Sequence, residues 1–241
     1  MARTTFLKNH SHGSSNAPRD YAMNELDSRH EICRIGASLY ARGYVHASAG
    51  NISVKLNDGS FLITPTDACL GNLVASELAH VSAEGVQLSG ARASKTLVLH
   101  RSIYEASSQA RCVIHTHATH LVSLTLQGVW RDTDIVPPIT PYYVMKVGHV
   151  PLIAYQRPGA PGVATEVTSR IAQSTAAHIP IRGVMLERLG PVVWHATLAQ
   201  ASAMLEELEE TAKLWLMSDR QATALTEAQI QELRETFGAL W

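Results

Sequence analysis

Two histidines stand two residues apart at the end of an apolar run, in the segment Val113-Ile114-His115-Thr116-His117. In an extended segment, side chains at positions i and i+2 point to the same side, with their Cα atoms ~6–7 Å apart. Two imidazoles placed in this way can share one divalent metal ion. Two ligands do not complete a metal site, so this pattern supports a metal pair and an ordinary strand end with hydrogen-bonded histidines about equally.

A second candidate is the small-residue segment 48–53, which contains Gly50 and Asn51. A turn of small residues beside a strand can present successive backbone N–H groups to an anion, and Asn51 adds a side-chain amide. A tight turn that needs Gly50 for its φ angle explains the same residues. Taken alone, this simpler interpretation is favoured.

Hydroxyl side chains begin two further segments, Thr64-Pro65-Thr66-Asp67 and Ala93-Ser94-Lys95-Thr96. Ser94 is predicted to cap a helix over residues 96–106, and a helix N-terminus attracts phosphate. Lys95 supplies a compact positive charge at the same place. Ordinary helix capping with a solvated lysine is the alternative.

Periodicity and turn signals predict the elements that position these residues. Helices are expected over residues 24–40, 96–106, 165–177, 198–217 and 226–241, with residues 120–127 as a helix or a strand end. Strands are expected over residues 52–56, 61–65, 112–115, 183–186 and 191–194, with two more short strands around residues 80–90. Hairpin signals at Asp58-Gly59 and Glu84-Gly85 favour antiparallel pairing. We therefore predict one three-layer α/β/α domain over residues 21–241 with a mainly antiparallel central sheet, after a disordered polar tail over residues 1–20.

Composition narrows the class of protein. The chain has 241 residues, 46% of them hydrophobic, and a formal net charge of −1, so no basic field suggests nucleic acid or a membrane surface. The three cysteines are far apart in the sequence, the N-terminus has no apolar leader segment, and no apolar run is long enough to cross a membrane. We expect a cytoplasmic protein.

Together, these segments follow the order and spacing of the class II aldolase/adducin family, which the chain resembles from about residue 22 to its C-terminus. The strings that carry the resemblance are GNIS (50–53), ITPTD (63–67), SKT leading to LHRSIY (94–104), VIHTHATH (113–120) and GVMLERLGPVVW (183–194). Within the family, the chain is most similar to the 3-oxo-tetronate 4-phosphate decarboxylases, through RGYVHASAGNIS, LGNL, the proline-rich stretch around residues 137–159 and MLEELEETAKL. The resemblance implies a homotetramer with active sites at subunit interfaces, where residues 130–160 and the C-terminal segment ending at Trp241 would make contacts.

The resemblance also implies roles for individual residues. His115 and His117 match metal ligands, and the metal would be zinc or, as a second choice, manganese. The positions that match a site for the substrate phosphate or its neighbouring oxygens are Gly50, Asn51, Thr66, Asp67, Ser94 and Lys95. The positions near the reacting atoms are Thr96, His100, Tyr142 and Tyr143, although His100 could equally be a core histidine or one that supports the site from behind.

Three positions depart from the family pattern. Leu189 stands where the family has its third metal histidine, and leucine cannot bind a metal ion. We expect His115, His117 and Leu189 to face a common cleft, with Glu187 or His120 as substitute ligands. Thr96 replaces a glutamate that serves as acid and base in aldolases, and Asp67 replaces a glycine found in many relatives.

These observations predict a metal-dependent decarboxylase that converts a 3-oxo-tetronate 4-phosphate to dihydroxyacetone phosphate and CO₂ through an enediolate. Loss of CO₂ needs no base to start, so Thr96 is compatible with it, whereas aldol cleavage requires a base that deprotonates a hydroxyl group. An aldolase of the fuculose or rhamnulose phosphate type is the alternative enzyme. A non-enzymatic relative with an impaired metal site is the alternative of another class.

Overall fold

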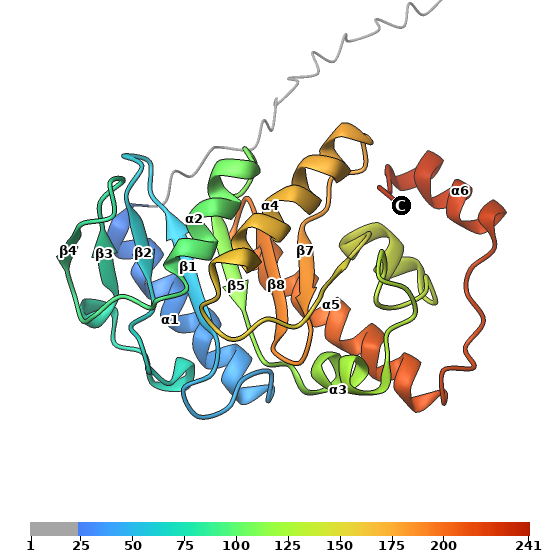
Figure 1. The fold of residues 1–241 in the computed structure, drawn as a ribbon, viewed down its shortest axis with the longest axis horizontal. Helices are drawn as coiled ribbons and strands as arrows, with labels where there is room; N and C mark the ends of the chain where they lie inside the picture. The colour runs from blue at the N-terminus through green and yellow to red at the C-terminus, as the bar shows by residue number, and fades with distance from the viewer. Residues whose placement is uncertain (1–23) are drawn as a thin grey trace, which may run out of the picture.

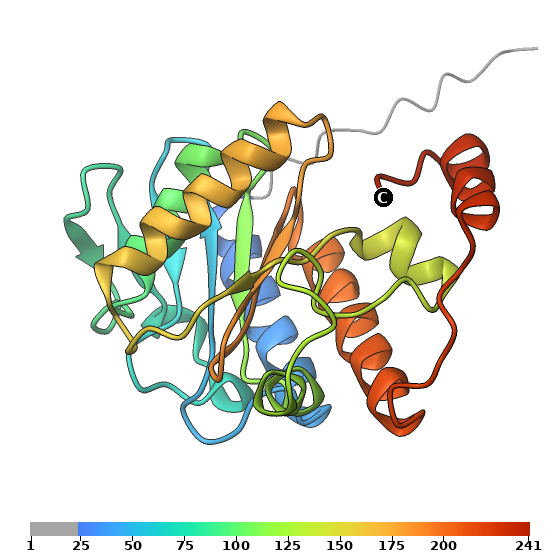
Figure 2. The same cartoon turned by 45° about the vertical axis from the view of Figure 1, so that its right-hand side comes forward.

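The computed structural model describes residues 24–241, so the tail predicted for residues 1–20 lies outside the described residues. One eight-stranded sheet has the strand order β4-β3-β2-β1-β5-β8-β7-β6. Every neighbouring pair is antiparallel except β6 and β7, which are parallel. Helices cover both faces of this sheet, as Figures 1 and 2 show. The predicted three-layer α/β/α fold with a mainly antiparallel sheet is confirmed, whereas the division into a tail and a single domain over residues 21–241 stays a prediction.

The strands are short and mostly buried. Their bounds are β1 Asn51–Lys55, β2 Phe61–Ile63, β3 Ala79–Val81, β4 Gln87–Ser89, β5 Cys112–His115, β6 Leu152–Ile153, β7 Gly183–Leu186 and β8 Gly190–His195. The central strand β5 has a continuous apolar sequence before His115, because helices cover both faces of the sheet there. Ile114 packs in the cluster on one face of the sheet, and Val113 packs in the cluster on the other.

The helices divide between the two faces. Their bounds are α1 Glu25–Ala41, α2 Leu97–Ala106, α3 Thr119–Gln127, α4 Pro161–Ala176, α5 Leu198–Met217 and α6 Glu227–Phe237. Helices α1, α3 and α5 lie on one face, where apolar residues of α1 and α5 join the larger core cluster. Helices α2 and α4 lie side by side on the other face. Each of these five helices therefore uses one apolar side to cover the sheet, whereas α6 packs elsewhere.

Three helix boundaries differ from the expectations. Helix α2 begins at Leu97 with Thr96 as its N-cap, so the prediction that Ser94 caps it is wrong, because the preceding turn is not yet α-helical. Helix α4 begins at Pro161, earlier than expected, since proline is well suited to the first helical turn. Helix α6 ends before Gly238, which adopts the left-handed conformation of a C-terminal cap.

Residues 130–160 contain elements that the sequence did not indicate. A π-helical segment η3 spans Tyr143–Val147, and the edge strand β6 follows it. Helix α6 packs against η3, at the end of the molecule where the C-terminus lies (Figures 1 and 2). In the part of the chain that the structure describes, no helix is both long and apolar enough to cross a membrane.

Candidate active site

Four strand ends meet at one edge of the sheet, the lower edge in Figure 1. Strands β1 and β8 begin there, and β2 and β5 end there, because the neighbouring strands are antiparallel. Asn51, the first residue of β1, pairs directly with His115, the last residue of β5. Directly opposed residues turn their side chains to the same face, so both point toward the α2 side. The sheet thus brings together two segments that are far apart in the sequence.

His115 is held in one tautomer. The residue is 8% exposed, and Nδ1 lies 2.9 Å from the carbonyl oxygen of Pro191. A carbonyl oxygen only accepts, so Nδ1 carries the hydrogen and Nε2 keeps a free lone pair. Burial, with a smaller contribution from His117, lowers the pKa of His115 to about 4. The ring is therefore neutral at neutral pH and presents Nε2 to a metal ion or a hydrogen-bond donor.

His117 lies close to His115 and to a third histidine. The ring centroids of His115 and His117 are 5.1 Å apart, and that of His46 lies 6.2 Å from His117. Burial and the neighbouring His46 both lower the pKa of His117. His46 belongs to the connection between α1 and β1, and the sequence analysis gave it no role. No local spacing links it to the His-x-His pair, because His46 lies 69 positions before His115.

Leu189 lies in the tight turn between β7 and β8. The N–H of Leu189 donates to the carbonyl oxygen of Leu186, and Arg188 takes a positive φ of 64°. Leu189 is partly buried against the core cluster on the α2 and α4 face. The alternation of β5 turns His115 to this same face, so the two positions share one side of the sheet. That Leu189 faces one cleft with both histidines stays a prediction.

The two substitute ligands suggested by the sequence form hydrogen bonds with other segments. Glu209 of α5 accepts from Nδ1 of His120 at 2.8 Å and from the backbone N–H groups of His120 and Leu121. Oε2 of Glu187 accepts from the backbone N–H of Tyr155 at 2.9 Å. Both hydrogen bonds support a neighbouring segment, but a bond through Nδ1 leaves the other ring nitrogen of His120 available, as it does at His115.

The donor set therefore fits a three-ligand metal centre only in part. Two imidazoles stand in suitable positions, and a leucine occupies the third position. Among residues 24–241, no three His, Cys, Asp or Glu side chains are grouped closely enough to hold a metal ion. A complete metal centre at the three family positions does not fit this chain.

Gly50 and Asn51 form the start of the proposed anion site. Gly50 has a φ of +83°, and a Cβ built there would lie 2.8 Å from the carbonyl oxygen of His115. Only glycine fits this close approach, as the simpler interpretation of the turn required. Asn51 is 6% exposed, and its Oδ1 has no hydrogen-bond partner among the described residues. A buried acceptor without a partner is costly, which points to a ligand that would satisfy it.

The two hydroxyl-bearing segments lie side by side next to β1. The N–H of Thr64 donates to the carbonyl oxygen of Ile52 at 3.0 Å, and the N–H of Ser94 donates to that of Thr64 at 3.3 Å. Thr66 is held in the same way through its N–H to Arg92. Backbone hydrogen bonds thus connect four segments in a row: the end of β5 at His115, the start of β1, residues 64–67, and the residues that precede α2.

Four candidate phosphate-site positions lie in these two segments, and the structure gives the backbone or side-chain setting of each. Asp67 has a positive φ of 58°, the left-handed region that glycine adopts freely, so the glycine that the family resemblance implies here would fit without strain. The hydroxyl groups of Ser94 and Thr96 lie 2.8 Å apart, and Lys95 between them is exposed. The hydroxyl groups and the ammonium group thus lie at the N-terminus of α2, where the helix dipole also favours an anion.

His100 lies one turn further along α2 and is fully buried. Ser53 connects it with Tyr104: Oγ of Ser53 lies 2.7 Å from Nδ1 of His100 and 2.6 Å from the hydroxyl of Tyr104. Burial, with a smaller contribution from His115, lowers the pKa of His100 to about 3. This position favours the interpretation of His100 as a neutral residue that supports the site from behind. Sequence reasoning missed Ser53 and Tyr104, because nothing local marks their contact with α2.

The two tyrosines differ in exposure. Tyr143 is fully buried, and its ring centroid lies 5.4 Å from that of Trp241. Its hydroxyl has no hydrogen-bond partner among the described residues, and burial raises its pKa. Tyr142 is 62% exposed, so of the two tyrosines it is the one open to solvent or to a neighbouring molecule.

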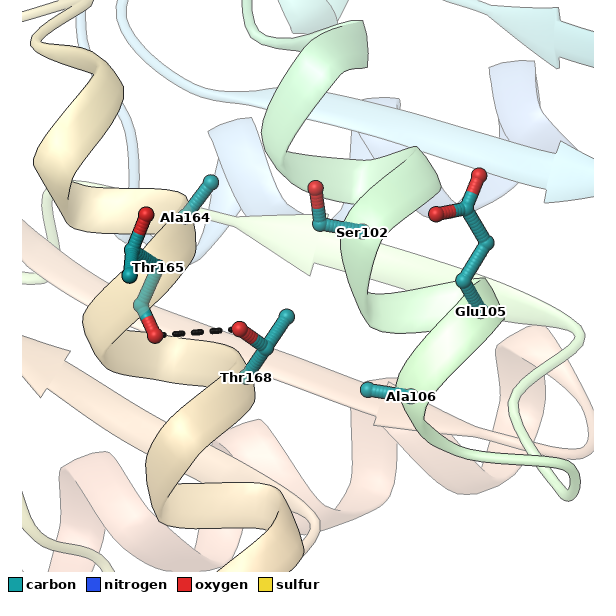
Figure 3. A pocket seen from close by; sticks show the side chains of 6 residues that line it. All are labelled: Ser102, Glu105, Ala106, Ala164, Thr165 and Thr168. Atoms are coloured by element: carbon teal, nitrogen blue, oxygen red, sulfur yellow. Dashed lines mark hydrogen bonds between the residues drawn. The ribbon is translucent and has the colours of Figure 1, made fainter.

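A surface groove between α2 and α4 lies apart from these residues (Figure 3). It has a volume of about 430 Å³, and its lining side chains are Ser102, Glu105, Ala106, Ala164, Thr165 and Thr168. None of them is a candidate site residue. The groove has small side chains and no convergent set of titratable groups, so the sheet edge remains the candidate site.

Comparisons with known proteins agree with the fold. The family model described as Class II Aldolase and Adducin N-terminal domain matches residues 30–216. A 3-oxo-tetronate 4-phosphate decarboxylase from Cupriavidus necator is 56% identical over 222 residues, which cover 90% of this chain and 99% of the relative. An L-fuculose phosphate aldolase from Methanocaldococcus jannaschii is 31% identical over 188 residues, which cover 78% of this chain and 93% of the relative.

Among solved structures, YgbL from Escherichia coli superposes with a TM-score of 0.79 at 39% identity, covering 87% of this chain and 99% of YgbL. The family is generally dependent on divalent metals. One family model matches residues 30–216, and the fold is shared with YgbL. Both findings indicate the same family. The chain belongs to the class II aldolase and adducin family.

Proposed function

We propose that this protein is a carboxy-lyase that decarboxylates a 3-oxo-tetronate 4-phosphate to dihydroxyacetone phosphate and CO₂. The observation that carries the proposal is the row of anion-binding groups at the sheet edge, with a threonine in place of an acid–base carboxylate at position 96. The relative from Cupriavidus necator, which bears the decarboxylase name and is similar over nearly its whole length, supports the same substrate class.

The reaction balances with one proton. The bond between the carboxylate carbon C1 and C2 breaks, and its electron pair forms a double bond between C2 and C3 while the C3 ketone oxygen becomes negative. CO₂ leaves, and a proton added to C2 completes dihydroxyacetone phosphate. The site must therefore stabilise the negative charge on the C3 oxygen and supply a proton to C2.

Binding of the phosphate is assigned to the row of residues around β1. The backbone N–H groups at Gly50 and Asn51, the hydroxyl groups of Thr66 and Ser94, and the ammonium group of Lys95 can all donate to phosphate oxygens. Asp67 would lie beside them and would limit how much negative charge the loop accepts. This fixed anchor would hold C1 and C3 in one orientation, which lowers the entropic part of the barrier.

Thr96 and His100 fit a reaction that starts without a base. A hydroxyl group at position 96 can orient a substrate oxygen, but it cannot take a proton from a hydroxyl group as a carboxylate can. His100, buried and neutral, would keep Ser53 and β1 in place without meeting the substrate. We therefore assign Thr96 to orientation and His100 to positioning.

Proton delivery is assigned to water or to Tyr142. The family resemblance implies a homotetramer with active sites between subunits, and Tyr142 is the exposed member of the tyrosine pair. In such an assembly, Tyr142 of one subunit would approach the site of the next, while Tyr143 would stay under Trp241 and stabilise the segment. Light scattering at micromolar concentration tests the assembly, and a stable monomer would contradict it.

We propose zinc as the metal, ahead of manganese, because both available donors are imidazole nitrogens. His115 and His117 are the residues assigned to it. Cytoplasmic location also stays a prediction. The three free cysteines, Cys33, Cys69 and Cys112, agree with a reducing compartment.

An aldolase is the second candidate, supported by the likeness to the L-fuculose phosphate aldolase. It requires a base at the position of Thr96, so the geometry favours it less. A non-enzymatic relative is the third candidate, supported only by Leu189. One experiment separates the three: incubation of the purified protein with phosphorylated 3-oxo-tetronates and, in parallel, with fuculose and rhamnulose 1-phosphates. Release of CO₂ supports the proposal, aldehyde release from the sugar phosphates supports the aldolase, and neither product supports the third candidate.

A matched pair of variants tests the phosphate anchor. Lys95→Gln removes one charge-assisted hydrogen bond, worth about 1.5–3 kcal/mol, so we expect KM to rise about 10- to 100-fold. Lys213→Gln removes a lysine that pairs with Glu210 at 3.7 Å on α5, and it should leave KM unchanged. Equal KM values for Lys95→Gln and Lys213→Gln would remove Lys95 from the site.

A further inference from the structure

A second cavity lies at the edge of the sheet opposite the candidate active site, the upper edge in Figure 1. Strand β5 begins there at Cys112 and β8 ends there at His195, so the cavity adjoins the far ends of two strands that carry the candidate site. Its volume is about 210 Å³, and it lies beside the ends of α2 and α4. Pockets for drug-sized ligands measure ~300–1,000 Å³, so this cavity suits a smaller molecule.

Trp194 contributes a buried donor to this cavity. The residue is 1% exposed, and its Nε1 has no hydrogen-bond partner among residues 24–241. A buried tryptophan N–H usually finds an acceptor, and leaving it without one costs free energy. Trp194 lines the cavity, so an acceptor bound there would satisfy this N–H group.

Arg182 adds a positive charge from the neighbouring strand. The register that pairs Gly183 with Val193 places Arg182 opposite Trp194, so both side chains turn to the face that α2 and α4 cover. Arg182 also lines the cavity, and it takes part in none of the ion pairs found among residues 24–241. No aspartate or glutamate belongs to the described residues of the wall. A guanidinium group without a carboxylate partner therefore lies beside an indole N–H without an acceptor.

The remaining wall decides the charge of the cavity. Residues 107–109 supply two hydroxyl groups and one amide, which can donate to oxygen atoms. The C-terminal ends of α2 and α4 carry partial negative charge, which opposes an anion. Backbone N–H groups of Ser107 and of residues 177–179 donate to carbonyl groups at these ends and offset part of this charge. Burial lowers the pKa of His195, so Arg182 provides the full charge of the wall.

We infer that this cavity is a second binding site, for a small organic anion whose head is a carboxylate or a phosphate group. Arg182 pairs with two oxygens of the head, the arrangement that a guanidinium group favours, and Nε1–H of Trp194 donates to one of them. Ile181, an apolar residue of the wall, contacts the carbon part of the ligand. None of these residues belongs to the candidate active site, so the inference does not depend on the proposed decarboxylase activity.

Calorimetric titration of the full chain with malonate and, separately, with inorganic phosphate tests the site and shows which head it prefers. All titrations use the Lys95→Gln background, because this change weakens the anion anchor of the candidate active site. Arg182→Gln removes the charge, and Trp194→Phe removes the N–H but keeps an aromatic ring. Arg111→Gln is the matched control, because Arg111 is an exposed arginine at the same edge that does not line the cavity. We expect the better-bound anion to bind about tenfold more weakly to Arg182→Gln, roughly threefold to tenfold more weakly to Trp194→Phe, and unchanged to Arg111→Gln.

The indole N–H resonances give a second measurement, on Trp194 itself. The chain has four tryptophans, and Trp194→Phe identifies the resonance of Trp194 by its loss. We expect this resonance to shift as the anion is added, and to stay in place in Arg182→Gln at the same anion concentration. Thermal unfolding without anion shows whether each variant keeps the fold, and the partly exposed Arg182 provides the test if Trp194→Phe does not.

Three results would overturn the inference. The first is equal anion affinity in Arg182→Gln and Arg111→Gln. The second is a Trp194 indole resonance that does not respond to the anion. The third is a protein that binds neither malonate nor phosphate at millimolar concentration in the Lys95→Gln background.

Discussion

Replacement of Gly50 by alanine tests whether the close approach of β1 and β5 builds the site. Gly50 has a φ of +83°, where an L-residue is strained by roughly 1–2 kcal/mol. The added Cβ would also lie 2.8 Å from two atoms, the carbonyl oxygen of His115 and Cγ1 of Val45. The backbone of β5 cannot retreat, because β1 and β8 hold it on both sides.

Gly43 provides the matched control in the same connection between α1 and β1. Its φ is +75°, but a Cβ there would meet no atom within 4 Å. Gly43→Ala should therefore cost only the backbone strain, roughly 1–2 kcal/mol. Gly50→Ala should add about 1–3 kcal/mol for the overpacked contact, which gives about 2–5 kcal/mol in total.

The assay is thermal and urea unfolding of both variants beside the unchanged protein. At ~2–4 °C of Tm per kcal/mol for a chain of this size, Gly43→Ala should lower Tm by about 4 °C and Gly50→Ala by about 10 °C. Because the clash displaces Asn51 and His115 from each other, Gly50→Ala should also raise KM for the phosphorylated substrate, and Gly43→Ala should not. Equal losses of Tm in the two variants would refute the reasoning about the close approach.

Two further predictions concern buried titratable groups. The pKa of His100 is about 3 in the folded protein, against 6.5 in the unfolded chain. As the pH falls below 6.5, the unfolded chain binds a proton that the folded protein does not, so the free energy of unfolding decreases. Between pH 7.5 and pH 5, this residue alone should lower the free energy of unfolding by about 2 kcal/mol. Urea unfolding at these two pH values should show a smaller loss for His100→Asn, and an identical loss in both proteins would contradict the assignment. Glu209, 2% exposed, accepts three hydrogen bonds from His120 and Leu121, so Glu209→Ala should lose about 2–4 kcal/mol of unfolding free energy. Glu210→Ala, at the exposed neighbouring position, should change the same urea midpoint little, and similar midpoints for the two variants would show that the Glu209 contacts contribute little.

Local pattern was sufficient for most elements of the sheet edge. The apolar run ending at His115 predicted β5 with its correct bounds, and the run around Gly190 predicted β7 and β8. The hairpin signal at Asp58-Gly59 predicted the antiparallel pairing of β1 and β2. Boundaries at α2, α4 and α6 shifted by a few residues, because turn residues and cap geometry decide where a helix starts and ends. The short elements between residues 140 and 153 gave no signal, since they are too brief for a period to show.

The site could be predicted only where its residues lie within one segment. Residue type and order marked Gly50, Asn51, Ser94 and the His-x-His pair, and the left-handed φ of Asp67 agrees with the glycine of relatives. Burial bears on alternatives that the sequence left open: His100 is enclosed behind Ser53, and Tyr143 lies under Trp241. A histidine or tyrosine at the same place in a motif can be exposed or buried, and the motif itself does not tell which.

The sequence by itself determined the element types, the antiparallel tendency and the family, because periodicity, turn chemistry and motif order are written in neighbouring residues. The tertiary structure alone decided which distant residues meet. It placed His46 beside His117, and it engaged His120 with Glu209 across 89 positions. These contacts depend on strand order and on the packing of helices against each face, and strand order is fixed by the whole set of long-range pairings. No local pattern in the chain contains that information.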